Sequence, residues 1–123
     1  MHPFPPQENL SFLQGLELRQ VVLDPHSVAF VLEGVNASVR LVAEGGFDYI
    51  DTDGKAHVYD IQHEWPPVVF HPLVRSQDCV TGVDVSDWRL ALTFASGRKL
   101  IIHSEEGPYE SGQIFCGDQL IVF

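Results

Sequence analysis

The chain is 123 residues long, a length that fits one domain with a hydrophobic core of its own. Seventeen Asp and Glu residues against seven Lys and Arg residues give a net charge of −10, which disfavours nucleic-acid phosphates and anionic membrane surfaces as partners. No run approaches the roughly 18 apolar residues of a membrane span, and residues 1–6 lack the basic and apolar regions of a signal peptide. We therefore expect a soluble, cytoplasmic protein.

The first third of the chain predicts an arm followed by three strands. Three prolines among the first six residues predict an extended N-terminal arm over residues 1–12. A strand is predicted at 17–24 and ends at Asp24-Pro25, because proline cannot donate to a sheet ladder. Residues 27–33 alternate with apolar side chains on both faces, which indicates a central strand, and residues 37–43 return beside them.

The dipeptide Asp53-Gly54 is the strongest hairpin signal in the sequence. A type I′ turn needs a positive φ at both central positions, which Asp tolerates and Gly adopts freely. A two-residue loop of this kind would pair Ile50 with His57, because loop length sets the register. We therefore predict a hairpin with that pairing.

The segment that follows this hairpin contains three prolines within an apolar run. Proline suits the first turn of a helix and is excluded from a central strand. We therefore predict one short irregular helix at about 66–75. Five further strands are predicted after the helix, at 79–86, 88–95, 99–104, 111–116 and 119–123.

Residues 17–44 and 79–105 share one pattern: an apolar strand, an acidic turn, an alternating strand, a Gly turn and a second apolar strand. Such internal similarity predicts a duplicated three-strand meander. Three apolar residues of the first unit align with three of the second: Val28, Phe30 and Leu32 with Leu90, Leu92 and Phe94. A one-residue deletion in the Gly turn then aligns Val39 and Leu41 with Leu100 and Ile102.

These elements predict a mainly β protein, with α+β as the alternative class. The predicted domain covers residues 13–123 and contains about ten short antiparallel strands built from the duplicated meander. Whether the two meanders share one sheet or form two facing sheets stays open at this point.

Motifs for catalysis or metal binding are not found in the sequence. The six histidines contain no His-x-His or His-x-x-x-His pair, and Cys79 and Cys116 lack a Cys-x-x-Cys partner. Asp48, Asp51 and Asp53 resemble a fragment of a calcium loop, but the closing Glu is missing and the predicted hairpin explains the same residues. No Gly-x-Ser-x-Gly motif or phosphate-binding Gly loop is present. We therefore predict no catalytic residue, no metal site and no cofactor.

Two groups of residues remain as candidates for contacts with other molecules. The candidates for a small ligand are His57, Tyr59, His63 and Glu64. The candidates for contact with a protein partner are Trp65, Phe70, Tyr109 and Glu110. Aromatic and mixed polar side chains of this kind are common at binding surfaces.

Four short motifs stand out along residues 13–123: Leu13-Gln14-Gly15-Leu16, Leu90-x-Leu92-x-Phe94-x-Ser96-Gly97, Tyr109-Glu110-Ser111 and Gly117-Asp118-Gln119-Leu120. Together they resemble an uncharacterised family of short bacterial domains. The resemblance implies the same pair of meanders and a closing apolar strand, but no established activity. That family usually carries a Trp after the Tyr-Glu pair, whereas this chain continues with Ser111 and Gly112. Some small acidic bacterial proteins of comparable build look like immunity proteins against secreted toxins.

We expect a binding or interaction module without catalysis, because the chain is strongly acidic and carries no reactive motif. Immunity-like neutralisation of a basic protein partner is one version of this function. One alternative is a small-ligand-binding protein or hydrolytic enzyme in a half-open β-barrel. The other is a structural homo-oligomer that pairs its edge strands.

Overall fold

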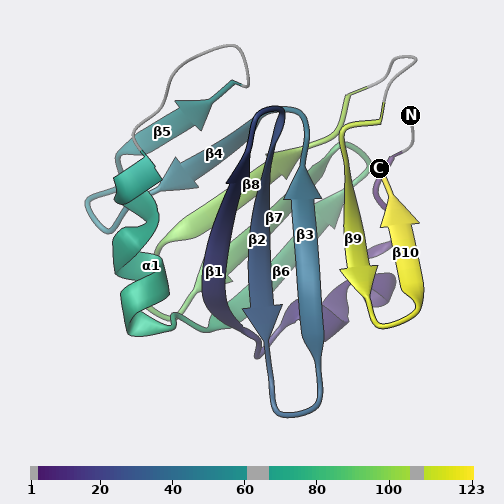
Figure 1. The fold of residues 1–123 in the computed structure, drawn as a ribbon, viewed down its shortest axis with the longest axis horizontal. Coiled ribbons are helices and arrows are strands. Elements are labelled where there is room, and N and C mark those ends of the chain that lie inside the picture. Colours follow the sequence, from purple (N-terminus) through teal and green to yellow (C-terminus); the bar gives the residue numbers. More distant parts are fainter. Residues whose placement is uncertain (1–2, 61–66, 106–109) are drawn as a thin grey trace.

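The computed structural model describes residues 3–60, 67–105 and 110–123. Within these ranges ten strands form two five-stranded antiparallel sheets that pack face to face (Figure 1), so the chain is mainly β, as predicted. The front sheet of Figure 1 contains, in spatial order, β1 (Glu17–Asp24), β2 (Ser27–Glu33), β3 (Ser38–Ala43), β9 (Gly112–Cys116) and β10 (Gln119–Val122). The back sheet contains, in spatial order, β5 (Ala56–Tyr59), β4 (Phe47–Ile50), β8 (Lys99–His103), β7 (Arg89–Phe94) and β6 (Val80–Ser86).

The strand order reveals a repeat that is larger than the predicted meander. The two meanders, β1–β2–β3 and β6–β7–β8, lie in different sheets, which answers the question left open by the sequence. The hairpin after each meander crosses to the opposite sheet: β4–β5 pairs with β8, and β9–β10 pairs with β3. Each half of the chain, β1–β5 or β6–β10, is therefore a five-strand unit whose hairpin completes the sheet of the other half.

A bulge occurs at the same place in both meanders. In β1 it lies between Leu18 and Gln20, and in β6 it lies between Val80 and Gly82. A bulge bends its strand and redirects the side chains around it. Its recurrence at equivalent positions agrees with a duplicated unit.

The third strands of the meanders correct the predicted alignment. Leu41 in β3 faces Phe30, and Leu100 in β8 faces Leu92. Because Phe30 corresponds to Leu92, Leu41 corresponds to Leu100 and not to Ile102. Eleven positions separate Phe30 from Leu41 but eight separate Leu92 from Leu100, so the deletion is three residues long rather than one. The second meander closes with the tighter turn.

The β4–β5 hairpin also differs from its predicted register. Ile50 pairs with Ala56 rather than with His57, and residues 51–55 form a five-residue loop. The Asp51 carboxylate closes this loop by accepting hydrogen bonds from two later backbone N–H groups, at 2.9 and 3.0 Å. A change of one residue in register moves every side chain to the other face. His57 therefore lies opposite Tyr49.

The predicted short helix is present as a 3-10 turn, Pro67–Phe70, followed by α1, His71–Ser76. This segment lies beside β1 (Figure 1). It packs one ring into the space between the sheets. The ring centroid of Phe70 is 5.6 Å from that of Phe30 in the front sheet and 5.4 Å from that of Tyr49 in the back sheet. The helix therefore closes one side of the sandwich.

The N-terminal segment, expected as an extended arm, contains two 3-10 turns, Gln7–Asn9 and Ser11–Leu13. Both turns contact β6. Phe4 and Leu10 are buried, and the ring of Phe4 stacks on Phe123 with centroids 4.3 Å apart. The segment is thus part of the core and covers an edge of the back sheet.

Candidate binding cleft at the crossing of the two halves

The two segments in which the chain changes sheets meet at one place. The backbone N–H of Glu44 donates to the carbonyl of Ser111 at 2.8 Å, and the N–H of His103 donates to the carbonyl of Gly46 at 3.1 Å. The hydroxyl of Ser111, a buried residue, also accepts the N–H of Glu105 at 3.0 Å. Ser111, the last residue of the Tyr-Glu-Ser motif, therefore connects the two crossovers.

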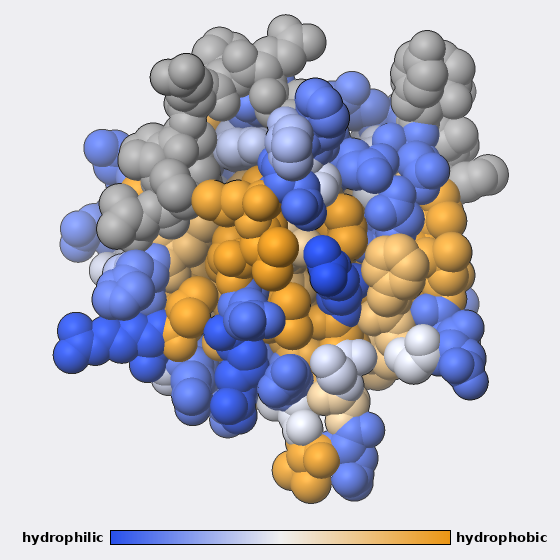
Figure 2. Space-filling view, viewed as in Figure 1, coloured by the Kyte–Doolittle hydropathy of each residue, from blue (hydrophilic) through white to orange (hydrophobic). Residues whose placement is uncertain are grey.

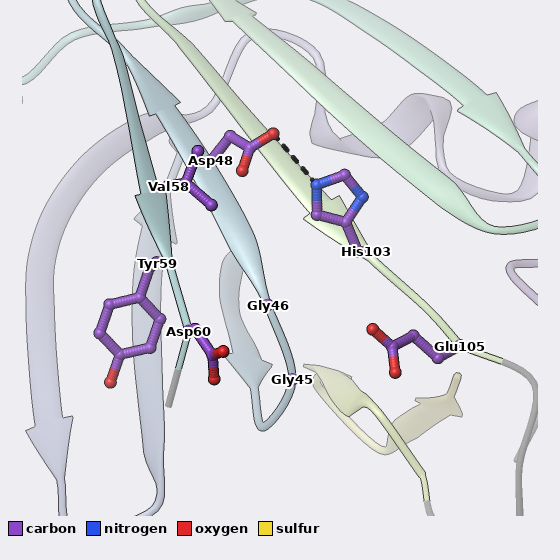
Figure 3. Close-up of a pocket in the computed structure, with 8 residues that line it drawn as sticks. All are labelled: Gly45, Gly46, Asp48, Val58, Tyr59, Asp60, His103 and Glu105. Carbon is purple, nitrogen blue, oxygen red and sulfur yellow. Dashed lines mark hydrogen bonds and ion pairs between the residues drawn. The ribbon is translucent and has the colours of Figure 1, made fainter. Parts of the chain in front are cut away.

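A cleft of about 510 Å³ lies beside this crossing (Figure 3). Its lining comes from the first crossover, from β4 and β5, and from the end of β8 with the residues after it. The lining residues are Gly45, Gly46, Asp48, Val58, Tyr59, Asp60, His103 and Glu105. The two glycines contribute no side chains, so this part of the cleft is bounded by backbone.

The cleft is acidic. Asp48, Asp60 and Glu105 supply three carboxylates, and no Lys or Arg is among the lining residues that the structure describes. In Figure 3, Asp60 and Glu105 lie on either side of Gly45. His103 Nε2 lies 3.2 Å from the Asp48 carboxylate, which joins β8 to β4. A wall with this excess of negative charge favours a cationic group.

Tyr59 also borders this cleft, but its ring points away from Asp48 and His103 (Figure 3). Its ring stacks on the buried ring of Phe47 with centroids 4.5 Å apart, which fixes its position at the end of β5. The Tyr59 ring therefore belongs to the core face of the back sheet, and the carboxylates are the feature of the cleft that favours a cation.

A second, smaller cleft of about 260 Å³ lies at the loop end of the β4–β5 hairpin. His57 Nε2 lies 3.1 Å from the Asp51 carboxylate, and this hydrogen bond, with those from the loop N–H groups, holds the pKa of Asp51 below its usual value. Burial raises the pKa of Tyr49, and the nearby guanidinium of Arg98 opposes that effect. Groups of both charges line this cleft, unlike the larger one.

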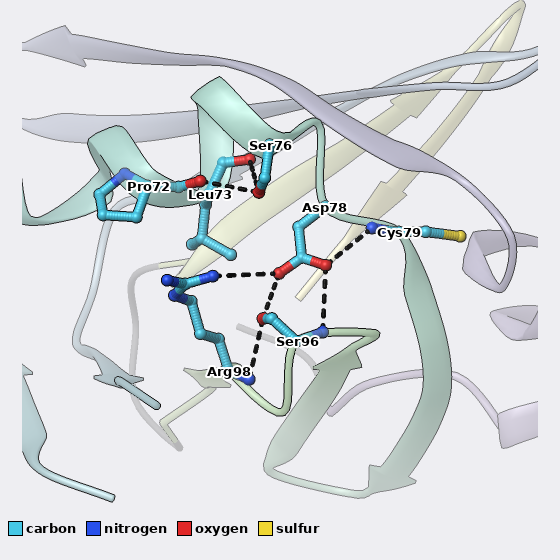
Figure 4. A network of polar contacts seen from close by, with 7 residues as sticks. All are labelled: Pro72, Leu73, Ser76, Asp78, Cys79, Ser96 and Arg98. Atoms are coloured by element: carbon cyan, nitrogen blue, oxygen red, sulfur yellow. Dashed lines mark hydrogen bonds and ion pairs between the residues drawn. The ribbon is translucent and has the colours of Figure 1, made fainter. Parts of the chain in front are cut away.

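A buried carboxylate positions Arg98 at the smaller cleft (Figure 4). Asp78 is 6% exposed, and its carboxylate lies 3.6 Å from the Arg98 guanidinium. It also accepts hydrogen bonds from the Ser96 hydroxyl, from the N–H of Ser96 at 3.2 Å and from the N–H of Cys79 at 3.1 Å. This network connects the end of α1 to the β7–β8 turn.

The structure separates the residues predicted to bind a small ligand. His57 and Tyr59 lie on the same face of β5, but His57 lines the smaller cleft and Tyr59 lines the larger. His63 and Glu64 lie outside the described residues. The predicted group therefore does not line a single cleft in the described part of the chain.

The residues predicted to contact a partner also have different environments. Phe70 is 2% exposed and belongs to the core, so it offers almost no surface to another protein. Glu110 is exposed and accepts a hydrogen bond from the side chain of Gln113 at 2.6 Å. Trp65 and Tyr109 lie outside the described residues.

The larger cleft depends on residues that the sequence did not single out as a site. The sequence places Asp48 only in a calcium-loop fragment and gives no signal for His103 or Glu105. Asp48 and His103 are 55 positions apart, and they meet because the β4–β5 hairpin crosses to the second meander. No local motif signals such a pairing.

Among the described residues, no group of three His, Cys, Asp or Glu side chains is arranged to hold a metal ion. None of the helices in that part of the chain has the length and apolar character needed to cross a membrane. Comparison with known protein families, with characterised proteins and with solved structures finds no match. The family resemblance of the sequence motifs therefore stays an expectation, and only the clefts and surfaces bear on function.

Proposed function

We propose that this protein is a non-catalytic binding module that docks a basic protein partner at the larger cleft. The observation that carries the proposal is the set of three carboxylates, Asp48, Asp60 and Glu105, around an opening lined by no described Lys or Arg. A Lys or Arg side chain of the partner would form charge-assisted hydrogen bonds with these carboxylates.

The charge of the whole chain supports the same kind of partner. A net charge of −10 accelerates the approach of a basic protein, and salt weakens this effect by screening. Immunity-like neutralisation of a basic toxin is one version of the proposed function, since an inhibitor benefits from rapid association.

A peptide titration followed by NMR tests the proposal. The ¹⁵N-labelled protein is titrated with a short capped peptide that contains one Arg, and with a control peptide in which Gln replaces that Arg. We expect only the Arg peptide to shift the amide signals of Gly46, Asp48 and His103, and the shifts to shrink at high salt. Absence of Arg-dependent shifts at the cleft would contradict the proposal.

Two charge-matched variants separate the cleft from the overall charge. The test variant removes three cleft carboxylates: Asp48→Asn, Asp60→Asn and Glu105→Gln. The control variant removes three carboxylates that do not line the cleft: Glu8→Gln, Glu33→Gln and Asp118→Asn. Arg-peptide binding should be lost in the first variant and kept in the second. Equal loss in both would assign the attraction to net charge and not to the cleft.

A further inference from the structure

β10 is an edge strand of the front sheet, and half of its backbone groups face away from that sheet. Gly112 and Phe123 exchange two hydrogen bonds, at 3.1 and 3.2 Å. Hydrogen-bonded pairs alternate along an antiparallel ladder, so Leu120 and Val122 direct their N–H and C=O groups away from β9. No backbone hydrogen bond from any other described segment reaches these two residues. Within the described part of the chain, this edge is therefore open to a further strand.

Two other edges of the sandwich, β6 and the start of β1, are partly covered in the described structure. On β6, the N–H of Phe4 donates to the carbonyl of Asp87 at 2.7 Å, and the N–H of Val85 donates to the side chain of Gln7 at 3.4 Å. The start of β1 forms a bridge to the back sheet and is flanked by α1. β10 also lacks a charged residue, a proline and a bulge, the devices by which edge strands ordinarily avoid pairing.

The outer face of the front sheet next to this edge is apolar. Phe115 and Leu120 pair across β9 and β10 and are 40% and 55% exposed. Figure 2 shows hydrophobic side chains spread across this face of the molecule, interrupted by a few hydrophilic ones. On β3, β9 and β10 the outward positions carry no Asp or Glu, and Arg40 is the charged residue among them. Two copies can therefore approach here despite the net charge of the chain.

We propose that β10 pairs with β10 of a second copy around a two-fold axis, which joins two front sheets into one continuous sheet. Antiparallel pairing centred on Ile121 places Leu120 opposite Val122 of the second copy, so the free N–H and C=O groups of both residues are satisfied. The exposed Phe115–Leu120 pairs of the two copies then form one apolar surface. The larger cleft is lined from the back sheet and stays accessible to a basic partner.

Analytical ultracentrifugation with two matched leucine variants tests this dimer. Leu120→Lys places a charge on the proposed interface, whereas Leu23→Lys changes a leucine of similar exposure, 51%, on β1. The wild-type protein and Leu23→Lys should sediment as dimers at micromolar concentration and dissociate on dilution, and Leu120→Lys should be monomeric. A monomeric wild-type protein at every soluble concentration, or a Leu120→Lys dimer, would overturn the proposal.

Hydrogen exchange of the unmodified protein gives a second measurement that does not depend on the folding of a variant. The amides of Leu120 and Val122 should exchange slowly in concentrated protein and faster after dilution, while the Phe123 amide, bonded within the sheet, should change less. Exchange of the first two amides at a rate independent of concentration would contradict pairing at this edge.

Discussion

The β4–β5 hairpin and the β9–β10 hairpin occupy equivalent places in the two sheets. Different side chains fill the core beside the two hairpins. The register makes Phe47 equivalent to Gly112. Phe47 fills its own position and stacks on Tyr59. At Gly112 the space belongs to Phe123, because a Cβ added to this glycine would lie 2.5 Å from the Phe123 ring. The space beside Gly112 is thus filled by the ring of Phe123, the residue after β10.

The same comparison shows how the larger cleft differs from the equivalent place in the other half of the molecule. Asp48 and His103, which form its hydrogen-bonded pair, are equivalent to Gln113 and Glu44 in the other half. The duplicated backbone therefore carries the Asp–His pair only once among these equivalent positions. The two halves share a framework, and the site comes from side chains on β4 and at the end of β8 that the other half does not repeat.

Each meander has a corner where the residue before its first strand meets the turn after its second strand, and the two corners differ in polarity. Leu16 corresponds to Asp78, and Gly34 corresponds to Ser96. A Cβ added to Gly34 would lie 2.8 Å from the Leu16 side chain, so this corner is a tight apolar contact. In the second half Asp78 and Ser96 are hydrogen-bonded instead, and Asp78 also holds Arg98 at the smaller cleft.

We expect the largest effect from a substitution at Gly112, where the Phe123 ring occupies the space of a side chain. In Gly112→Ala the new Cβ would clash with the Val42 carbonyl oxygen as well as with the ring, so strand β9 must shift. We expect the free energy of unfolding to fall by about 2–3 kcal/mol, the cost of overpacking a tight site. Urea denaturation measures this free energy.

Gly82→Ala is the matched control, because its Cβ would meet the Thr93 side chain at an ordinary 3.5 Å. We expect a change below about 1 kcal/mol in this variant. Equal effects in both variants would refute the packing argument.

An intermediate effect is expected at the polar corner. Asp78→Asn keeps the shape of the side chain but removes the charge that holds Arg98 and Ser96. We expect a loss of about 1–2 kcal/mol in the free energy of unfolding, because the guanidinium loses its buried counter-charge. Asp84→Asn, an exposed carboxylate on β6, is the control and should change the stability by less than about 0.5 kcal/mol. Equal stability of the two variants would mean that the charge of Asp78 does not stabilise the fold through this network.

Strand positions could be predicted from the sequence because alternation and turn residues are local signals. Val28, Phe30 and Leu32 face the core as their spacing indicates, and the proline-containing helix is present. The destination of each hairpin could not be predicted, because pairing with a neighbouring strand or with the opposite sheet depends on how the complete core packs. The β4–β5 register was missed for a related reason: Asp51 uses its side chain to close a longer loop than Asp53-Gly54 alone requires.

The candidate site was less accessible to sequence reasoning than the fold. The acidic composition indicated the charge of a partner, but the cleft joins Asp48 to His103 and Glu105 across two crossovers. They lie close together because the two halves exchange hairpins. The spacing of residues in the sequence does not predict this exchange. Tyr59 was identified as a candidate, yet its neighbours in the cleft were not.

The smallest expected effect concerns the long loop that the first hairpin has and the second lacks. The pKa of Asp51 is lowered because its carboxylate accepts hydrogen bonds from His57 and from the loop backbone. A carboxyl group whose pKa is lower in the folded than in the unfolded state stabilises the fold above its unfolded pKa, and this contribution is lost as the pH falls through the folded pKa. Wild-type protein should therefore be more stable than Asp51→Asn at neutral pH, and the difference should narrow below about pH 4. Urea denaturation at several pH values measures it, with Asp53→Asn, an exposed residue of the same loop, as the control that should show no such narrowing. A stability difference for Asp51→Asn that persisted unchanged in acid would mean that the ionised carboxylate does not hold this loop.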